Sequence, residues 1–198
     1  VVGLRTELFT AIYTGQNQAA TEIFVDQKII DKLDLFPSAN LIYGLNDNTN
    51  LRFSYSRTTA RPSFKEASKS QIFDPITNRL FIGNIDLNPS YINNFDVRAE
   101  FFGENSEMFA LSGFYKDFTD PIELTFYESA PDQLTPRNLG NASVFGIEFE
   151  FRKSLGFILN SLENLKFIIN ASYIESELTM FEDEYNRRVN AARDGESI

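Results

Sequence analysis

The chain has 198 residues, a mass of 22.6 kDa and neither histidine nor cysteine, which excludes histidine-based catalytic triads, thiolate nucleophiles, disulfides and nitrogen or sulfur metal sites. Its 18 basic and 28 acidic residues give a formal charge of −10. Nucleic acid is therefore not an expected partner, because phosphate backbones are bound mainly through basic side chains. Because the sequence starts at Val1 without an initiator methionine, we expect a fragment of a longer protein.

Aromatic residues make up 14% of the chain, yet its mean hydropathy is only −0.25. No apolar run approaches the roughly 20 residues that a membrane-spanning helix needs, and no segment has the pattern of a signal peptide. A helical membrane protein is therefore excluded. A membrane β-barrel is compatible with these values, because its strands carry apolar residues only at every second position.

Apolar and polar residues alternate with period two in seven segments, which predicts seven β-strands. The pattern is clearest at residues 50–59, where Leu51, Phe53 and Tyr55 are separated by polar side chains. It is equally clear at residues 143–152, where phenylalanines alternate with glutamates. In chain order, the predicted strands cover residues 2–13, 35–45, 50–59, 95–102, 108–118, 143–152 and 165–174.

The predicted connections alternate in length. Those at residues 46–49 and 103–107 are compact turns, and that at 153–164 is of modest length. The connections at the other end are long and cover residues 14–34, 60–90 and 119–141, followed by a tail at 175–198. Short turns at one end and long loops at the other are typical of outer-membrane barrels. Strands of ten to twelve residues rising ~3.3 Å per residue at ~45° tilt also match an apolar band of ~25 Å.

We therefore predict an all-β fold, an antiparallel up-and-down transmembrane β-barrel segment of about seven strands from a larger barrel. Single-chain bacterial barrels have an even number of strands, and unpaired edges are costly in lipid, so seven strands do not complete one. The charges at alternate strand positions indicate a wide, wet interior. The predicted lumen-facing residues are Arg52, Asp96, Arg98, Glu100, Glu148, Glu150 and Arg152.

Several segments resemble the barrel of TonB-dependent outer-membrane receptors, especially those of Bacteroidetes type. They are FPS at residues 36–38, the strand at 50–58 with RTTARPSF at 57–64 and Glu66, NASVFGIEFE at 141–150, and NASYI at 170–174. The resemblance covers about residues 1–176, nearly all of the chain. The run at 57–64 is the more specific part, and that at 145–148 is moderately specific.

The resemblance implies a 22-stranded barrel in a Gram-negative outer membrane, blocked by an N-terminal plug and energised through TonB for the uptake of a bulky nutrient such as a siderophore or a glycan. Residues 1–198 would be part of that barrel domain, and the plug, the TonB box and the remaining strands are absent from this sequence. The implied partners are outer-membrane lipids, the TonB complex through the absent plug, the nutrient and, in some members, a surface lipoprotein. No enzymatic activity, cofactor or metal is expected.

Three residues near the outer end of the third predicted strand are candidate ligand-binding residues. Arg57 and Arg61 flank this strand end and Glu66 follows, so a cationic pair there suits an anionic substrate or the plug. The competing interpretation is a rim ion pair that orders the next loop. Pro62 favours that interpretation, because it restricts the backbone of the preceding residue and ends the strand.

Two other interpretations follow from the residues alone. A soluble lipocalin-like barrel or β-sandwich would use the phenylalanine faces to line a ligand cavity, although the loop asymmetry and strand lengths speak against it. Glu148 and Glu150 lie on one strand face at a spacing that suits a hydrolase carboxylate pair. The favoured interpretation of both glutamates is a solvated lumen wall whose charge is balanced by the neighbouring Arg152 or Arg98. The acidic run at residues 182–184 is interpreted as part of a solvated loop and not as a cation site, because it lacks the alternating ligands of a calcium loop.

Overall fold

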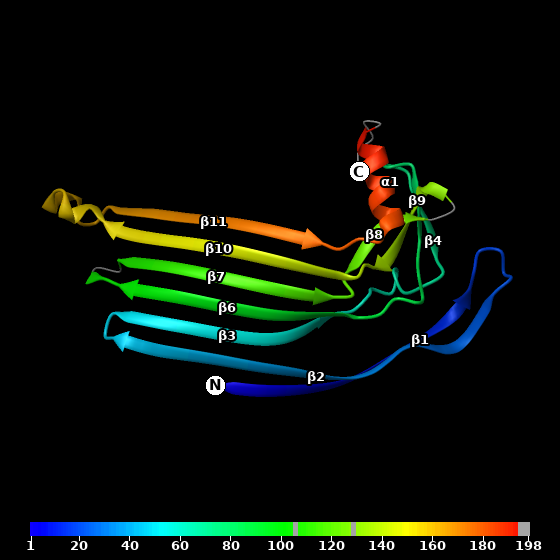
Figure 1. Cartoon of the computed structure of the whole chain (residues 1–198), viewed down its shortest axis with the longest axis horizontal. Helices are drawn as coiled ribbons and strands as arrows, with labels where there is room; N and C mark the ends of the chain where they lie inside the picture. The colour runs from blue at the N-terminus through cyan, green and yellow to red at the C-terminus, as the bar shows by residue number, and fades with distance from the viewer. Residues whose placement is uncertain (105–106, 128–129, 194–198) are drawn as a thin grey trace.

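The computed structural model describes residues 1–104, 107–127 and 130–193. Seven long strands form one antiparallel sheet in the order β1-β2-β3-β6-β7-β10-β11 (Figure 1). Each strand lies next to its neighbour in the meander, which confirms the seven-stranded antiparallel prediction. The strands cover Val2–Gln16, Ile23–Asn46, Thr49–Ala60, Ser90–Phe102, Met108–Thr119, Asn141–Ser154 and Lys166–Leu178.

A second, smaller sheet lies at the end of the long connections, in the order β4-β5-β9-β8 (Figure 1). Its strands are β4 (Gln71–Asp74), β5 (Arg79–Ile82), β8 (Ile122–Tyr127) and β9 (Ala130–Asn138). Within the described residues, the only parallel pairing is between β5 and β9, and it joins residues more than fifty positions apart. Local periodicity does not report such a pairing, so the sequence did not predict this sheet.

Helical segments are short. The helix α1 (Glu182–Arg193) follows β11 and lies beside the small sheet, within the tail that was predicted as a loop (Figure 1). Two single-turn 3₁₀ helices, at Leu155–Phe157 and Asn160–Leu162, lie in the connection between β10 and β11. In the described part of the chain, no helix has the length and apolar character needed to cross a membrane.

The long loop predicted at residues 14–34 is wrong. β1 and β2 pair as far as Gln16 and Ile23, so only residues 17–22 form the turn. The side-chain oxygen of Asn17 accepts hydrogen bonds from the amides of Thr21 and Glu22 and closes it. Irregularities in the β1–β2 pairing after Ala11 and after Tyr13 interrupt the alternation of side chains. The sequence pattern is lost there although the hairpin continues.

The register of the large sheet separates its side chains into two faces. Leu51, Ala99, Leu111 and Phe149 stand opposite one another across β3, β6, β7 and β10. We call their side of the sheet the apolar face. Side chains one position away along each strand project to the opposite side, because successive strand residues point to opposite faces. We call that side, which carries Arg52 and Arg98, the polar face.

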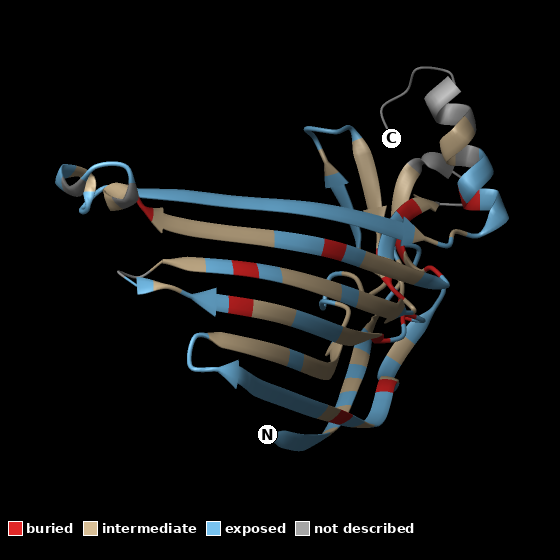
Figure 2. Cartoon of the chain, turned by 60° about the vertical axis from the view of Figure 1, so that its left-hand side comes forward, coloured by how far each residue is buried: buried red, intermediate tan, exposed pale blue. Residues whose placement is uncertain are grey.

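The apolar face is not covered by any other layer of the described chain. Large side chains on it, such as Phe53 and Phe95, are each 47% exposed. Several buried segments gather where the large sheet meets the long connections (Figure 2). Among the fully buried apolar residues, Leu87 and Leu139 belong to those connections, and Ala110 lies within β7 on the opposite face of the large sheet. A soluble monomer rarely leaves a continuous apolar surface of this size open to water. The face therefore requires an apolar environment, such as the hydrocarbon of a membrane.

Two neighbouring rows of side chains, each running across the strands, mark the end of this face that lies toward the long connections. The first, which we call the aromatic row, crosses four strands and consists of Tyr55, Phe95, Tyr115 and Phe145. The next row toward the long connections, which we call the boundary row, consists of Arg57, Asn93, Asp117 and Ser143. A change from aromatic to polar residues within one step along four strands is expected where hydrocarbon gives way to water, because amphipathic rings favour that interface.

The large sheet does not close on itself. β1 and β11 form its two edges, and within the described residues neither pairs with the other. A lipocalin-like barrel would require that closure, and a sandwich would require a second layer against the apolar face. The fold therefore disfavours the soluble alternatives and fits a section of a larger barrel wall.

The turn between β4 and β5 provides a test of local electrostatics. The Asp74 carboxylate accepts hydrogen bonds from the Ile76 amide (3.0 Å) and the Thr77 hydroxyl (2.8 Å). These bonds lower the pKa of Asp74 below its ordinary value near 3.8. Stability that depends on a lowered carboxyl pKa is present above the ordinary value and is lost as the pH falls through the folded value.

We therefore expect the β4–β5 turn to exchange its amide hydrogens faster once the pH falls below the ordinary pKa of an aspartate. Hydrogen exchange followed by mass spectrometry, corrected for intrinsic rates, measures this. The Asp74→Asn variant should show fast exchange in this turn already at neutral pH. Unchanged protection in the variant would contradict the assignment.

Candidate functional site

The polar face carries a chain of ion pairs across neighbouring strands. Arg98 donates from Nε to Glu100 (2.8 Å), from Nη1 to Ser112 (2.9 Å) and from Nη2 to Glu150 (3.0 Å). Arg52 donates to the second oxygen of Glu100 at 2.7 Å. We call Arg52, Glu100, Arg98 and Glu150 the ion ladder. It ties β3, β6 and β10 together across β7.

Small residues at the centre of the ladder explain its geometry. Ala110 lies between Glu100 and Glu150 in the register and is fully buried. Because its side chain is a single methyl group, both carboxylates reach the guanidinium of Arg98. The carboxylate of Glu100 is only 8% exposed and has two arginine partners. A charge buried to this degree is tolerated only when it is paired and hydrogen-bonded.

The other predicted lumen residues lie on the same face. Asp96 accepts from the Ser54 hydroxyl at 3.3 Å. Arg152 approaches Glu150 only at 3.9 Å. Glu148 lines a shallow depression of about 350 Å³ beside Arg98 and Glu150. The structure thus brings all seven predicted residues to one face, and their exposure to a lumen stays a prediction.

Glu148 and Glu150 do not form an isolated catalytic pair. Glu150 is bound to Arg98, and both glutamates line an open depression together with Asn170 and Ser172. A general acid of a glycosidase needs a raised pKa, which burial away from cations produces. Glu150 instead lies 3.0 Å from the guanidinium of Arg98. This arrangement suits a wall and not an active site.

The three candidate ligand-binding residues are not brought together as one group. Arg61 donates to Glu7 of β1 at 2.6 Å and its guanidinium lies 4.3 Å from the ring centroid of Phe9. Glu66 accepts from both the amide and the hydroxyl of Ser63, each at 2.8 Å. Arg57 belongs to the boundary row, on the side of Tyr55, and its guanidinium lies 4.8 Å from the ring centroid of Tyr91.

The Arg61–Glu7 pair has a structural role in addition to its place near the rim. β2 pairs with β3 only from Ser38 onward, at the residue after Pro37, which has no N–H to donate. On the side of Ser38 toward the β1–β2 turn, the hairpin contacts the rest of the chain through side chains. These contacts include hydrogen bonds from Arg61 to Glu7 and from Tyr91 to Asp34 (2.7 Å). At the rim, Arg61 is thus paired with Glu7 of β1, and a role of this pair in ordering the surrounding loops stays a prediction.

A double-mutant cycle tests that role. Arg61→Met and Glu7→Gln should each destabilise the β1–β2 hairpin, and the double variant should lose less than the sum of the two. We expect the coupling to be small but measurable, because both side chains are about a quarter exposed and water screens the pair. Denaturant unfolding of the full-length protein in lipid measures it, and additive effects of the two substitutions would exclude the pair as a clamp.

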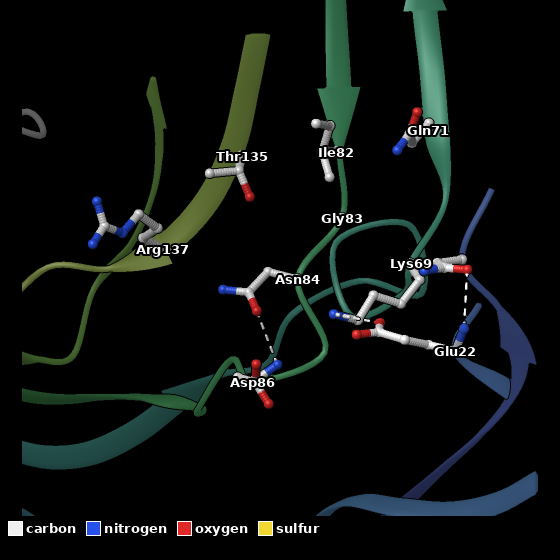
Figure 3. Close-up of a pocket in the computed structure, with 10 residues that line it drawn as sticks. Glu22, Lys69, Gln71, Ile82, Gly83, Asn84, Asp86, Thr135 and Arg137 are labelled. Atoms are coloured by element: carbon white, nitrogen blue, oxygen red, sulfur yellow. Dashed lines mark hydrogen bonds and ion pairs between the residues drawn. The ribbon is translucent and has the colours of Figure 1, made fainter. Parts of the chain in front are cut away.

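Two cavities lie at the end of the long connections. One, of about 680 Å³, includes Arg61 and Glu66 in its lining, together with apolar residues such as Ile92, Phe118 and Val144. The other, of about 630 Å³, lies between the β1–β2 turn, the connection from β3 to β6, and β9 (Figure 3). We call the second cavity the loop pocket. Both are large enough for a small-molecule ligand.

The loop pocket opens where β5 and β9 part after two paired positions. On one side Lys69 forms a loose ion pair with Glu22 at 3.7 Å, and on the other Thr135 and Arg137 project from β9 (Figure 3). Asn84 bridges the strands by donating to the Pro136 carbonyl at 3.1 Å. The lining is mixed in charge and rich in hydrogen-bonding groups.

The loop pocket contains residues that the sequence did not indicate. The side-chain amides of Asn17 and Asn84 form hydrogen bonds within and between the loops. By contrast, the described chain supplies no side-chain partner for Gln71 or Asp86. These two side chains therefore remain available to a ligand. The sequence predicted residues 60–90 as a long connection between two strands, and no local signal predicted which of its side chains would meet β9.

The acidic run in the first turn of α1 has arginine partners. Glu184 accepts from Arg188 at 2.7 Å and Asp183 lies 3.8 Å from Arg137, so two of the three acidic side chains have cationic partners. In the described parts of the chain, no three His, Cys, Asp or Glu residues gather as metal ligands would. The run forms the first turn of α1, where negative charge is favoured by the helix dipole.

The large antiparallel sheet has one apolar face and one charged face, with tight turns at one end and long connections at the other. These features define a section of an outer-membrane type β-barrel wall. Comparison with known families agrees with this class. Residues 1–197 match the family described as TonB dependent receptor-like, beta-barrel, and the chain belongs to that family. No curated protein sequence matches the chain.

Solved structures share the fold. The siderophore receptor PirA from Pseudomonas aeruginosa superposes with a TM-score of 0.63 at 18% identity, over 74% of this chain and 29% of that protein. A variant of the ferric enterobactin receptor PfeA from the same organism, in complex with enterobactin, gives 0.54 at 18% identity, over 72% and 22%. PirA from Acinetobacter baumannii gives 0.53 at 17% identity, over 72% and 23%. The chain thus spans about a quarter of the length of these receptors.

Proposed function

We propose that this chain forms wall strands and extracellular loops of an outer-membrane receptor that takes up a bulky nutrient with energy supplied through TonB. The observation that carries the proposal is the division of one continuous sheet into an exposed apolar face and an ion-paired polar face. Membership of the TonB-dependent receptor family supports it. The apolar face would meet lipid, and the polar face would line the lumen.

Residues 1–198 then belong to a single barrel domain, and the plug, the TonB contact and further strands belong to other parts of a longer protein. Two unpaired edge strands support this division, because each would pair with a neighbouring strand of the complete barrel. A surface lipoprotein is a further partner of the proposed receptor, at the same end as the loop pocket.

The nutrient would be recognised at the two cavities near the long connections. The solved structures with this fold are receptors for siderophores, including one in complex with enterobactin, which favours a siderophore over a glycan as the first ligand to test. Arg61 and Glu66 line one cavity, while Lys69, Gln71 and Asp86 line the other. Arg57 does not line either cavity, so we omit it from the proposed nutrient site.

Expression of the full-length receptor in a strain lacking its own siderophore receptors tests the proposal. The protein should sediment with outer membranes, require detergent for extraction, and restore growth on at least one ferric siderophore only when TonB is present. Recovery of the folded protein in the soluble fraction would overturn the membrane assignment. Growth that is independent of TonB would overturn the energised uptake.

A further inference from the structure

The half of the β1–β2 hairpin nearest the long connections divides into a root and a tip. The root is attached to the wall by two short hydrogen bonds, from Arg61 to Glu7 at 2.6 Å and from Tyr91 to Asp34 at 2.7 Å. We call residues 13–28 the hairpin tip. It extends beyond the end of the large sheet (Figure 1) and forms one side of the loop pocket.

Two bulges separate the root from the hairpin tip. The first lies after Ala11 and the second after Tyr13, and at each of them β2 contributes one residue more than β1. An extra residue on one strand bends a hairpin and interrupts its pairing locally. At the second bulge Asp26 adopts a φ of 49°, and the hydroxyl of Thr14 donates to its carboxylate (3.1 Å) and accepts from its amide (3.0 Å). The bulges therefore provide a place at which the tip can rotate relative to the root.

The hairpin tip meets the connection from β3 to β6 at Lys69. The backbone amide of Lys69 donates to the Tyr13 hydroxyl at 3.2 Å. The ammonium group of Lys69 forms the loose ion pair with Glu22 at 3.7 Å (Figure 3) and lies 5.8 Å from the ring centroid of Phe24. The hydrogen bond and the ion pair are both longer than the two hydrogen bonds at the root. The tip is thus held less firmly than the root.

The position of Tyr13 depends on a glycine. The Tyr13 ring lies against Gly15, where an added Cβ atom would come within 2.7 Å of the ring carbon Cζ. Because Gly15 has no side chain, the ring can lie there with its hydroxyl at the Lys69 amide. The obstructed atoms are at the end of a movable side chain, so alanine at this position displaces the ring and leaves the backbone in place. We call Tyr13 and Lys69 the latch.

We propose that the hairpin tip is a gate of the loop pocket, hinged at the two bulges and held closed by the latch. The firm root lets the tip swing without disturbing the wall. A smaller cavity of about 330 Å³ lies between residues 17–19 of the tip and Gln71 of β4, so the tip is not packed tightly against the small sheet. This gate rests on the nutrient site proposed above, and it sets the rate at which a ligand enters and leaves the loop pocket.

Thiol labelling of the full-length receptor measures the gate without any ligand. Thr135 is buried and lines the loop pocket, and this chain has no cysteine, so Thr135→Cys provides a reporter once any cysteines elsewhere in the receptor are replaced by serine. In this background, Tyr13→Phe and Gly15→Ala should each raise the rate of modification by a bulky maleimide about fivefold, as expected for the loss of one hydrogen bond. Tyr43→Phe, which removes a hydroxyl near the other end of β2, is the matched control and should change nothing. Equal rates in all four proteins would overturn the gate.

Stopped-flow binding of a ferric siderophore identified by the growth test then connects the gate to uptake. Tyr13→Phe should raise the association and dissociation rate constants by similar factors and change Kd by less than about twofold, because the latch controls access and does not touch the ligand. A change in the dissociation rate alone would make Tyr13 a ligand contact and overturn the gate. Faster thiol labelling with unchanged siderophore kinetics would support the gate and refute the loop pocket as the nutrient site.

Discussion

Replacing Arg98 by Met should destabilise the barrel by about 2–3 kcal/mol, more than any other single substitution on the polar face. The physical reason is the ion ladder. Arg98 contacts Glu100, Ser112 and Glu150 at once, and the carboxylate of Glu100 is almost fully buried. Without Arg98 that carboxylate keeps only Arg52, and Glu150 keeps only the distant Arg152.

Guanidinium unfolding of the full-length receptor in lipid vesicles measures this effect. Arg152→Met is the matched control, because Arg152 lies on the same face but approaches Glu150 only at 3.9 Å and should cost less than about 0.5 kcal/mol. Replacing both Arg98 and Glu150, by Met and Gln, should recover part of the loss. Similar losses for Arg98→Met and Arg152→Met would show that the ladder does not hold the strands.

Replacing Gly83 by Ala should reshape the loop pocket while leaving the membrane strands intact. Gly83 follows β5 and lines the pocket (Figure 3). An added Cβ would clash with the carbonyl oxygen of Ser68 and lie 2.8 Å from that of Lys65. Both are backbone atoms, so the connection from β3 to β6 must move, at a cost of about 1–3 kcal/mol.

We expect the affinity for a ferric siderophore identified by the growth test to fall at least tenfold in Gly83→Ala, since ~1.4 kcal/mol corresponds to a factor of ten. Amide exchange at residues 65–71 should rise, and the unfolding of the barrel should not change. Gly44→Ala is the control, because an added Cβ there meets nothing closer than 3.7 Å. Unchanged affinity with increased loop exchange would place the nutrient site outside the loop pocket.

Local alternation explains why the large sheet could be predicted. On β3 and on most of β10, apolar side chains alternate with polar or charged ones, and the register preserves that division across five strands. The charged positions Arg52, Arg98 and Glu150 could therefore be assigned to one face from the sequence. Their partners could not, because the bond from Arg98 to Glu150 crosses β7 and depends on the size of Ala110.

The candidate ligand-binding residues show that closeness along one strand end does not predict closeness in space. Arg57 and Arg61 are four residues apart, yet Arg57 lies on the side of Tyr55 and Arg61 turns to Glu7 on a strand more than fifty residues earlier. Similarly, the loop pocket joins Glu22, Lys69 and Thr135 from three separate connections. Sequence patterns report neighbours along the chain and not neighbours across space.

The sequence alone determined the number of long strands, the central segment of each and the side that is apolar, because side-chain direction in a strand follows directly from the period of two. Only the tertiary structure decided which strands of the long connections pair, where the hairpin of β1 and β2 ends, and which charges meet. Those features depend on contacts between residues far apart in the chain, whose geometry is set by strand register and, at the ion ladder, by the small side chain of Ala110.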